Sequence, residues 1–240
     1  AVVLAGLIVP LSGKPAPIHF TGDLILFAYL FALGRFFTAL AALDTGSSFE
    51  GMGAAREVTF ACLAEPALFL GLLALARVNG GSGAGEGLSL SAFFGDPVAG
   101  AWLTAAPTLV LVVGGLFIVL LVENSRVPFD DPNTHLELTM IHEVMVLDHG
   151  GPALGAVLYG AAVKLFVLCA LVARLIVPVT SEHLLIRWPA FIGAMLVVAV
   201  LIGIVESIMA RLRLLHVPNL LVGACLLTGL GFVLLLGSPS

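Results

Sequence analysis

Apolar stretches, each about as long as a membrane-spanning helix, follow one another along most of the chain. The six complete stretches cover residues 23–43, 58–78, 99–122, 153–177, 189–210 and 218–236. A helix needs about 20 predominantly apolar residues to cross the hydrocarbon core of a bilayer, and each stretch has about that length. The sequence lacks the alternation of polar and apolar positions that marks the strands of a membrane β-barrel. The pattern therefore predicts an all-α, polytopic transmembrane helical bundle.

A shorter apolar run precedes the first complete stretch. The chain opens AVVLAGLIVPL, which has neither an initiating methionine nor the charged start of a signal peptide. We interpret this run as the end of a helix whose beginning is missing, so we expect six full spans plus a truncated N-terminal one. Residues 1–240 are expected to form a single transmembrane domain.

The most polar part of the chain is the loop of residues 123–152. Asp131 and Pro132 favour the start of a helix, because Asp caps a helix N-terminus and Pro fits its first position, and residues 150–152 end the segment. At 100° per residue, polar and apolar positions fall on neighbouring faces. The polar face holds His135, Thr139, His142, Glu143 and His149, and the apolar stripe holds Leu136, Met140, Val144 and Leu147. We expect an amphipathic helix at the membrane interface, and the alternative is a solvated acidic connector.

The three histidines of this loop do not predict a metal site. They are spaced seven residues apart, which is about 10.5 Å along a helix, whereas one ion needs ligands within about 2.1 Å. His142 and Glu143 do not belong to an H-E-x-x-H motif either, because Val146 stands where the second histidine would be. Histidines and carboxylates together can instead exchange protons near neutral pH.

Composition agrees with a membrane protein and excludes other classes. The chain is 60% hydrophobic and 10% charged, whereas soluble domains are about 45–50% apolar and 25% charged. The net charge of −5 argues against nucleic acid as a partner, because such proteins present a basic surface. The three cysteines lie singly in apolar stretches, and an iron–sulfur cluster needs about four convergent thiolates.

Basic residues suggest an orientation for the bundle. If the spans alternate in direction, loops 44–57, 123–152 and 211–217 share one face. Those loops carry Arg56, Arg126, Arg211 and Arg213, whereas the opposite face carries Lys14 and Arg187, with Arg77 at a helix end. The positive-inside rule therefore places the first set of loops in the cytoplasm.

Five charged residues fall inside the apolar stretches. They are Arg35, Glu65, Lys164, Arg174 and Glu206. Each costs roughly 2.5–3.5 kcal/mol near the bilayer centre on insertion scales, so each needs a partner, a wet cavity or a function. Arg174 lies near a helix end and can reach the interface, and Glu206 can pair with Arg211. Lys164, Arg35 and Glu65 suggest a buried polar track for proton or ion movement, and static ion pairs are the alternative.

A sequence motif in the loop points to a family. Residues 123–132 read E-x-x-R-x-P-F-D-x-P, which resembles the cytoplasmic loop of one membrane-subunit family of respiratory complex I (NADH-quinone oxidoreductase), the family of its subunit 1. The continuation D-D-P-N-T-H-L-E-L-T-M-I-H-E is similar to one branch, the membrane subunits of group 4 NiFe-hydrogenases such as formate hydrogenlyase and hydrogenase-4. Residues 53–66 and 206–213 agree, so the resemblance covers essentially the whole chain.

The resemblance implies a subunit without a redox centre, cofactor or metal of its own. Family members anchor a hydrophilic arm and join it to antiporter-like membrane subunits. The implied partners are the large and the small (iron–sulfur) subunits of the hydrogenase, which would hold the NiFe centre and iron–sulfur clusters, together with the antiporter-like subunits and the lipid bilayer. The implied location is the cytoplasmic membrane of a bacterium or archaeon.

The resemblance and the residue pattern together give two groups of candidate residues, none of them catalytic. The proton or coupling pathway comprises Glu65, Lys164, Glu206, Arg35 and Glu123. The arm-docking or chamber loop comprises Arg56, Arg126, Asp130, Asp131, His135, Glu137, His142, Glu143, Arg211 and Arg213. Arg56 and Glu65 match an Arg and a Glu nine residues apart in the family motif, which supports assigning these positions a role.

Departures from the complex I pattern bear on function. Complex I relatives carry P-E-x-E-x-E in this loop, whereas Asn133 and His135 stand at two of its acidic positions, which favours the hydrogenase branch. Family members normally have eight spans, so about the first fifth to quarter of the pattern is expected to be missing. We expect a non-redox membrane anchor and coupling subunit of a hydrogenase. The alternatives are a quinone-chamber subunit of an NADH-quinone oxidoreductase and a purely structural anchor.

Overall fold

The computed structural model shows a bundle of helices. It describes residues 1–11, 15–78, 88–94, 96–130, 140–178, 183–210, 212 and 214–237. In chain order the elements are α1 (Val2–Ile8), α2 (Asp23–Asp44), α3 (Ser48–Val78), α4 (Leu90–Phe93), α5 (Asp96–Thr104), α6 (Ala106–Glu123), the 3₁₀ turn η2 (Glu143–Val146), α7 (Gly151–Ile176), α8 (Leu184–Ile208), the 3₁₀ turn η3 (Leu214–His216) and α9 (Val217–Gly237). Every regular element in the described ranges is therefore helical.

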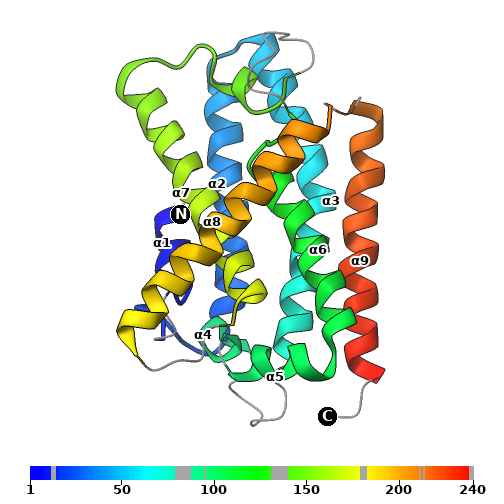
Figure 1. Ribbon diagram of the computed structural model, residues 1–240. Coiled ribbons are helices and arrows are strands. Elements are labelled where there is room, and N and C mark those ends of the chain that lie inside the picture. The colour runs from blue at the N-terminus through cyan, green and yellow to red at the C-terminus, as the bar shows by residue number, and fades with distance from the viewer. Residues whose placement is uncertain are drawn as a thin grey trace.

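Six of these helices, α2, α3, α6, α7, α8 and α9, are long and apolar enough to cross a membrane. They confirm the predicted all-α, multi-pass bundle. Helices α3, α6 and α9 pack against one another, α2 packs on α3, and α1 contacts both α2 and α7. Helix α7 also contacts α6 and α8, and α8 crosses the front of the bundle obliquely (Figure 1).

Glycines bring the helices α6 and α9 into close contact. A Cβ atom added at Gly231 would lie 2.6 Å from the side chain of Val112, and one added at Gly115 would collide with Thr228. Gly71 of α3 similarly leaves room for Leu116 of α6. Apolar burial gives helices in lipid little reason to associate, so close approach at small residues provides the packing energy instead.

The connections alternate between the two ends of the bundle, as the predicted spans require. The α2–α3 turn, the loop between α6 and α7, and the α8–α9 connection lie at one end (Figure 1). The short helices α4 and α5 lie at the other end. The loops that the sequence analysis grouped on one face therefore share a face.

Two spans differ most from their predicted limits. The stretch predicted over 99–122 is interrupted at Ala105, and a separate helix, α6, follows with Pro107 in its first turn. Proline has no backbone N–H and excludes the carbonyl four residues earlier, so a helix starts at this position rather than running through it. Helix α3 begins at Ser48, well before residue 58, and its first turns carry the polar residues Glu50 and Arg56, which bond to the backbone of the loop.

The described part of the polar loop is not a continuous amphipathic helix. Residues 140–150 contain one helical turn, η2, and the predicted helix start at Asp131 lies outside the described residues. Met140 and Val144 are buried as the predicted stripe requires, but Leu147 is 49% exposed. Backbone N–H groups in this segment donate to carboxylates instead of to carbonyls four residues earlier, as described below.

Candidate functional site

Arg35 of α2 lies at the centre of a buried group of charges. Its Nη2 atom is 2.7 Å from Oε1 of Glu123, and its Nη1 atom is 3.1 Å from Oε1 of Glu65. Its Nε atom is 3.9 Å from Oε1 of Glu57. Only 6% of the Arg35 side chain is exposed, so these contacts from α3 and α6 supply the partners that an arginine inside a membrane requires.

Lys164 of α7 completes this group through Glu123. Its Nζ atom is 3.1 Å from Oε2 of Glu123, so each carboxylate oxygen of Glu123 faces one cation. Glu123 is the last residue of α6, where the helix dipole disfavours a negative charge. The two cations compensate for that position and for a side chain that is only 3% exposed. We call Arg35, Glu57, Glu65, Glu123 and Lys164 the ion cluster.

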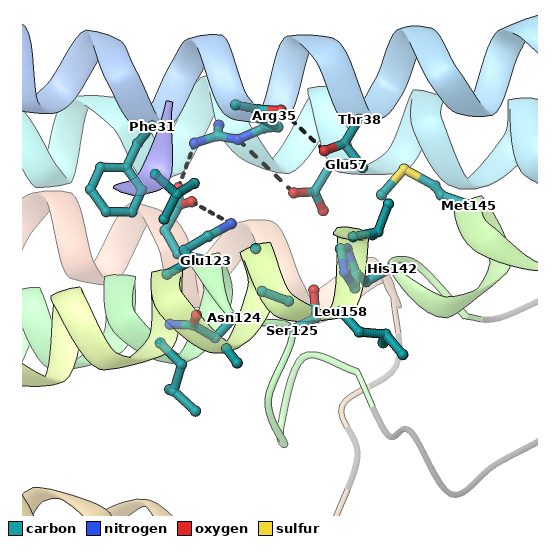
Figure 2. A pocket seen from close by; sticks show the side chains of 18 of the residues that line it. Phe31, Arg35, Thr38, Glu57, Glu123, Asn124, Ser125, His142, Met145 and Leu158 are labelled. Carbon is teal, nitrogen blue, oxygen red and sulfur yellow. Dashed lines mark hydrogen bonds and ion pairs between the residues drawn. The ribbon is translucent and has the colours of Figure 1, made fainter. Parts of the chain in front are cut away.

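Four members of the ion cluster, Arg35, Glu57, Glu123 and Lys164, line a cavity of 570 Å³. The cavity is lined by α1, α2, α3, the end of α6, the loop and α7, and its apolar lining includes Phe31, Phe37 and Leu165. Asn124, Ser125 and the charged side chains make the other part of the lining polar (Figure 2). One side of the cavity thus suits water or a polar group, and the other suits an apolar one.

His142 projects from the loop into the same cavity (Figure 2). Its Nε2 atom is buried and forms no hydrogen bond within the part of the chain that the structure describes. Burial, and then the positive charge of Lys164, lower the pKa of His142 to about 4. The imidazole is therefore neutral at pH 7, and its side chain is available to accept a proton.

Asp130 and Arg56 attach the loop to the bundle next to the cavity. One carboxylate oxygen of Asp130 accepts the backbone N–H groups of Ile141 at 2.8 Å and His142 at 3.1 Å. The Nη1 atom of Arg56, on α3, donates a hydrogen bond to the carbonyl of Met140 at 3.0 Å. These bonds hold His142 in place from both sides, so two of the predicted loop residues act as anchors.

Glu50 of α3 provides a second attachment farther along the loop. Its carboxylate is fully buried and accepts the backbone N–H of Asp148 at 2.8 Å and the hydroxyl of Thr45. His149 lies 3.7 Å from the same carboxylate and would form an ion pair when protonated. These side-chain bonds replace helical backbone bonds, which explains why residues 140–150 form no continuous helix.

The structure unites four of the five predicted pathway residues. Arg35, Glu65, Glu123 and Lys164 lie in the ion cluster, whereas Glu206 forms a separate pair with Arg126 at 3.4 Å. The partner predicted for Glu206, Arg211, lies outside the described residues. The other predicted positions outside them are Asp131, His135, Glu137 and Arg213.

The described remainder differs in detail from the prediction. Glu143 is the first residue of η2. Arg174 does not extend to the surface as expected, since it is only 2% exposed and its guanidinium lies 5.6 Å from the centre of the Phe94 ring. The aromatic face gives this cation an attractive contact inside the bundle.

Sequence reasoning missed Glu57 and Glu50. Both precede the apolar stretch of α3, so they read as polar residues of a loop and not as part of a buried helix face. Their spacing holds the missing signal, because Glu50, Glu57 and Glu65 fall within about 80° of one another on a helical wheel. Three carboxylates on one face of a helix would have led us to predict that buried cations of neighbouring helices contact that face.

The comparisons with known proteins agree with this architecture. A sequence profile described as NADH dehydrogenase matches residues 1–237. The chain belongs to the NADH dehydrogenase family. Two curated relatives from Escherichia coli (strain K12) are each 31% identical to this family member. Formate hydrogenlyase subunit 4 aligns with 88% of this chain and 67% of its own length, and hydrogenase-4 component C with 98% and 70%.

A solved structure shares the fold of this NADH dehydrogenase family member. It is a chain of the membrane-bound sulfane sulfur reductase, an archaeal respiratory membrane complex, with a TM-score of 0.74 and 18% sequence identity. The match covers 98% of this chain and 75% of the other. The resemblance drawn from the sequence motifs is therefore confirmed, and the chain is a complex I-related, multi-pass membrane subunit.

Proposed function

We propose that this chain is the non-redox membrane subunit of a complex I-related, membrane-bound NiFe-hydrogenase. In this role it anchors the hydrophilic electron-transfer arm and links electron transfer to proton or ion translocation. The ion cluster is the observation that supports the proposal most strongly, because it joins four helices and contains three carboxylates but only two cations. A merely structural group of charges in a membrane would be expected to balance.

The partner subunits would supply the redox chemistry through a NiFe centre and iron–sulfur clusters. This chain would supply the docking surface, which we assign to the cytoplasmic loops between α2 and α3, α6 and α7, and α8 and α9, in a bacterial or archaeal cytoplasmic membrane. Antiporter-like subunits would continue the ion pathway on the membrane side. The anchored segment 140–150 fits a docking role, because Arg56, Asp130 and Glu50 fix its backbone at defined points.

The position of the ion cluster provides a physical link between docking and ion movement. Two unit charges 4 Å apart interact by about 4 kcal/mol at an effective dielectric constant of 20. A small displacement of the loop beside the cavity, or a change of charge in the docked arm, therefore alters the proton affinity of the carboxylates in the ion cluster. Electron transfer in the arm can in this way drive proton uptake and release by residues of this chain.

The test is a pair of variants of the complex, reconstituted in liposomes with a pH-sensitive dye inside. Glu65→Gln should lower the number of protons translocated per hydrogen molecule formed while hydrogen formation and assembly persist, because it removes one partner of Arg35. Glu137→Gln, in the loop, is expected to act likewise. Asp96→Asn is the matched control, since Asp96 is exposed at the start of α5, at the end of the bundle away from the docking loops (Figure 1). Unchanged translocation in the Glu65 variant would contradict the assignment.

The cavity supports a second candidate, a quinone-chamber subunit of an NADH-quinone oxidoreductase. Its 570 Å³ lies within the range of small-molecule sites, and its apolar lining with a few polar groups suits a quinone. Inhibitors of quinone sites, such as rotenone or piericidin, separate the two. A hydrogenase should keep its full activity in their presence, whereas a quinone reductase should lose it.

A further inference from the structure

The three carboxylates of the ion cluster are paired to different degrees. Glu123 has two cation contacts, at 2.7 and 3.1 Å, and Glu65 has one at 3.1 Å. Within the described residues, the cation contact of Glu57 is the 3.9 Å approach to the Nε atom of Arg35, which is not a hydrogen bond. With two cations and three carboxylates, the ion cluster carries one excess negative charge when every group is ionised. Among the described contacts, Glu57 is the carboxylate of the ion cluster that lacks a cation at hydrogen-bonding distance.

Burial distinguishes Glu57 from the other weakly paired carboxylate. The Glu65 side chain is 39% exposed and accepts a hydrogen bond from Arg35, whereas the Glu57 side chain is 12% exposed and lines the cavity. An uncompensated charge in the interior is costly, and a carboxylate removes that cost by binding a proton. The excess charge of the ion cluster is thus most easily neutralised by one proton on Glu57.

His142 gives this carboxylate a route to the outside. Glu57 and His142 line the same cavity from α3 and from the loop, and the cavity has room for on the order of ten water molecules (Figure 2). The Nε2 atom of His142 has no partner among the described residues. Other charged and titratable groups surround Glu57 and His142. They are Arg35 on α2, Glu65 on α3, Glu123 on α6, Arg126 and Asp130 in the loop, and Lys164 on α7.

We propose that Glu57 binds the exchangeable proton of the ion cluster and that His142 transfers this proton between cavity water and the Glu57 carboxylate. As the proton enters, an O–H bond of hydronium breaks and an N–H bond forms at Nε2. That N–H bond then breaks as an O–H bond forms on Glu57, which leaves a neutral imidazole and a carboxylic acid. Release follows the same steps in reverse. This inference rests on the proposed function, because it assigns the proton-binding site of a coupling subunit.

The electrostatics of His142 suit transfer rather than storage. Burial, and then the positive charge of Lys164, disfavour a protonated imidazole and lower the pKa of His142, so the ring is neutral at pH 7. A proton that reaches Nε2 therefore leaves it quickly. The carboxylate of Glu57 lines the same cavity as His142 and, among the described residues, has no cation at hydrogen-bonding distance. His142 thus transfers the proton, and Glu57 holds it.

Infrared difference spectroscopy of the purified complex, titrated with pH in the absence of turnover, tests this assignment. The C=O stretch of a protonated carboxyl group should appear as the pH falls in the wild type and in Glu65→Gln. It should be absent in Glu57→Gln and present at a shifted frequency in Glu57→Asp. The Asp variant shows that loss in the Gln variant does not come from failure to fold. A band that persists in Glu57→Gln, or that disappears only in Glu65→Gln, would overturn the assignment.

A pH jump on the same samples tests the transfer step. His142→Gln should reach the same final band amplitude about 10²-fold more slowly, because the side chain keeps its polarity but cannot carry the proton. An unchanged rate would overturn the role of His142. Replacement of Na⁺ by choline in the buffer should leave the band unaltered, as the bound ion is a proton. These measurements need no turnover. The infrared result can therefore contradict the roles of Glu57 and His142 while the liposome assay still shows coupling, and the liposome assay can contradict the proposed function while the infrared band remains.

Discussion

Replacement of Lys164 by methionine is the sharpest test of whether the ion cluster takes part in proton translocation or only holds the helices together. The substitution removes a cation 3.1 Å from Oε2 of Glu123 and leaves Arg35 as the only described cation on that carboxylate. At this distance the lost attraction is about 5 kcal/mol at an effective dielectric constant of 20. Measurements on buried pairs that lose one partner give about 3–5 kcal/mol, so both figures agree.

The expected consequence follows from that magnitude. A change of about 3 kcal/mol alters the proton affinity of a carboxylate by about 10²-fold, so the ion cluster of Lys164→Met should retain a proton that the wild type releases. Proton translocation per hydrogen molecule in liposomes should therefore fall, while hydrogen formation by the arm continues. Lys164→Arg keeps the positive charge and should retain most of the translocation. Near-normal coupling in Lys164→Met would refute the reasoning and favour a purely structural anchor.

Three further predictions concern the loop and the bundle. Glu50→Gln should weaken the carboxylate's bond to the N–H of Asp148 and increase hydrogen exchange over residues 140–150, with Asp44→Asn as the unaffected control. Gly115→Leu should prevent α6 and α9 from packing and lower the thermal stability of the chain in detergent, whereas Gly114→Leu, beside which a Cβ atom meets nothing, should not. The pKa of His142 is about 4 in the folded loop and about 6.5 when the loop opens, so opening takes up a proton between these values. Once observed exchange rates are divided by the intrinsic amide exchange rates, which themselves fall with pH, the opening equilibrium of the loop should accordingly rise from pH 7 to pH 4.5 in the wild type and less in His142→Gln.

The fold was largely predictable because the bilayer fixes the length of a spanning helix. The stretches at 23–43 and 218–236 coincide closely with α2 and α9. The break at Ala105 was harder to predict, since Pro107 lies within an otherwise apolar run and proline is tolerated in many membrane helices. The start of α3 was misplaced because hydropathy marks where a helix enters the lipid and not where it begins.

The candidate site was predictable where charge was locally out of place. Arg35, Glu65 and Lys164 stand out because they interrupt apolar stretches, and the structure brings them together with Glu123. Glu57 could not be recognised in that way, since it follows Arg56 in a polar segment. The amphipathic helix predicted for the loop was wrong for a different reason. Bonds from the backbone to Asp130 and Glu50 depend on contacts between distant segments, which no local periodicity records.

The position of Glu123 at the end of α6 has a consequence for how the chain enters the membrane during synthesis. Arg35 emerges before both Glu57 and Glu65, so two carboxylates share one cation until α6 follows with a third. Only α7, which carries Lys164, reduces this excess. A nascent chain that ends before α7 therefore holds a helix whose buried end is undercompensated. The buried end of α6 accordingly gains its second described cation only after α7 has been made, which favours assembly of α2 to α7 as one unit.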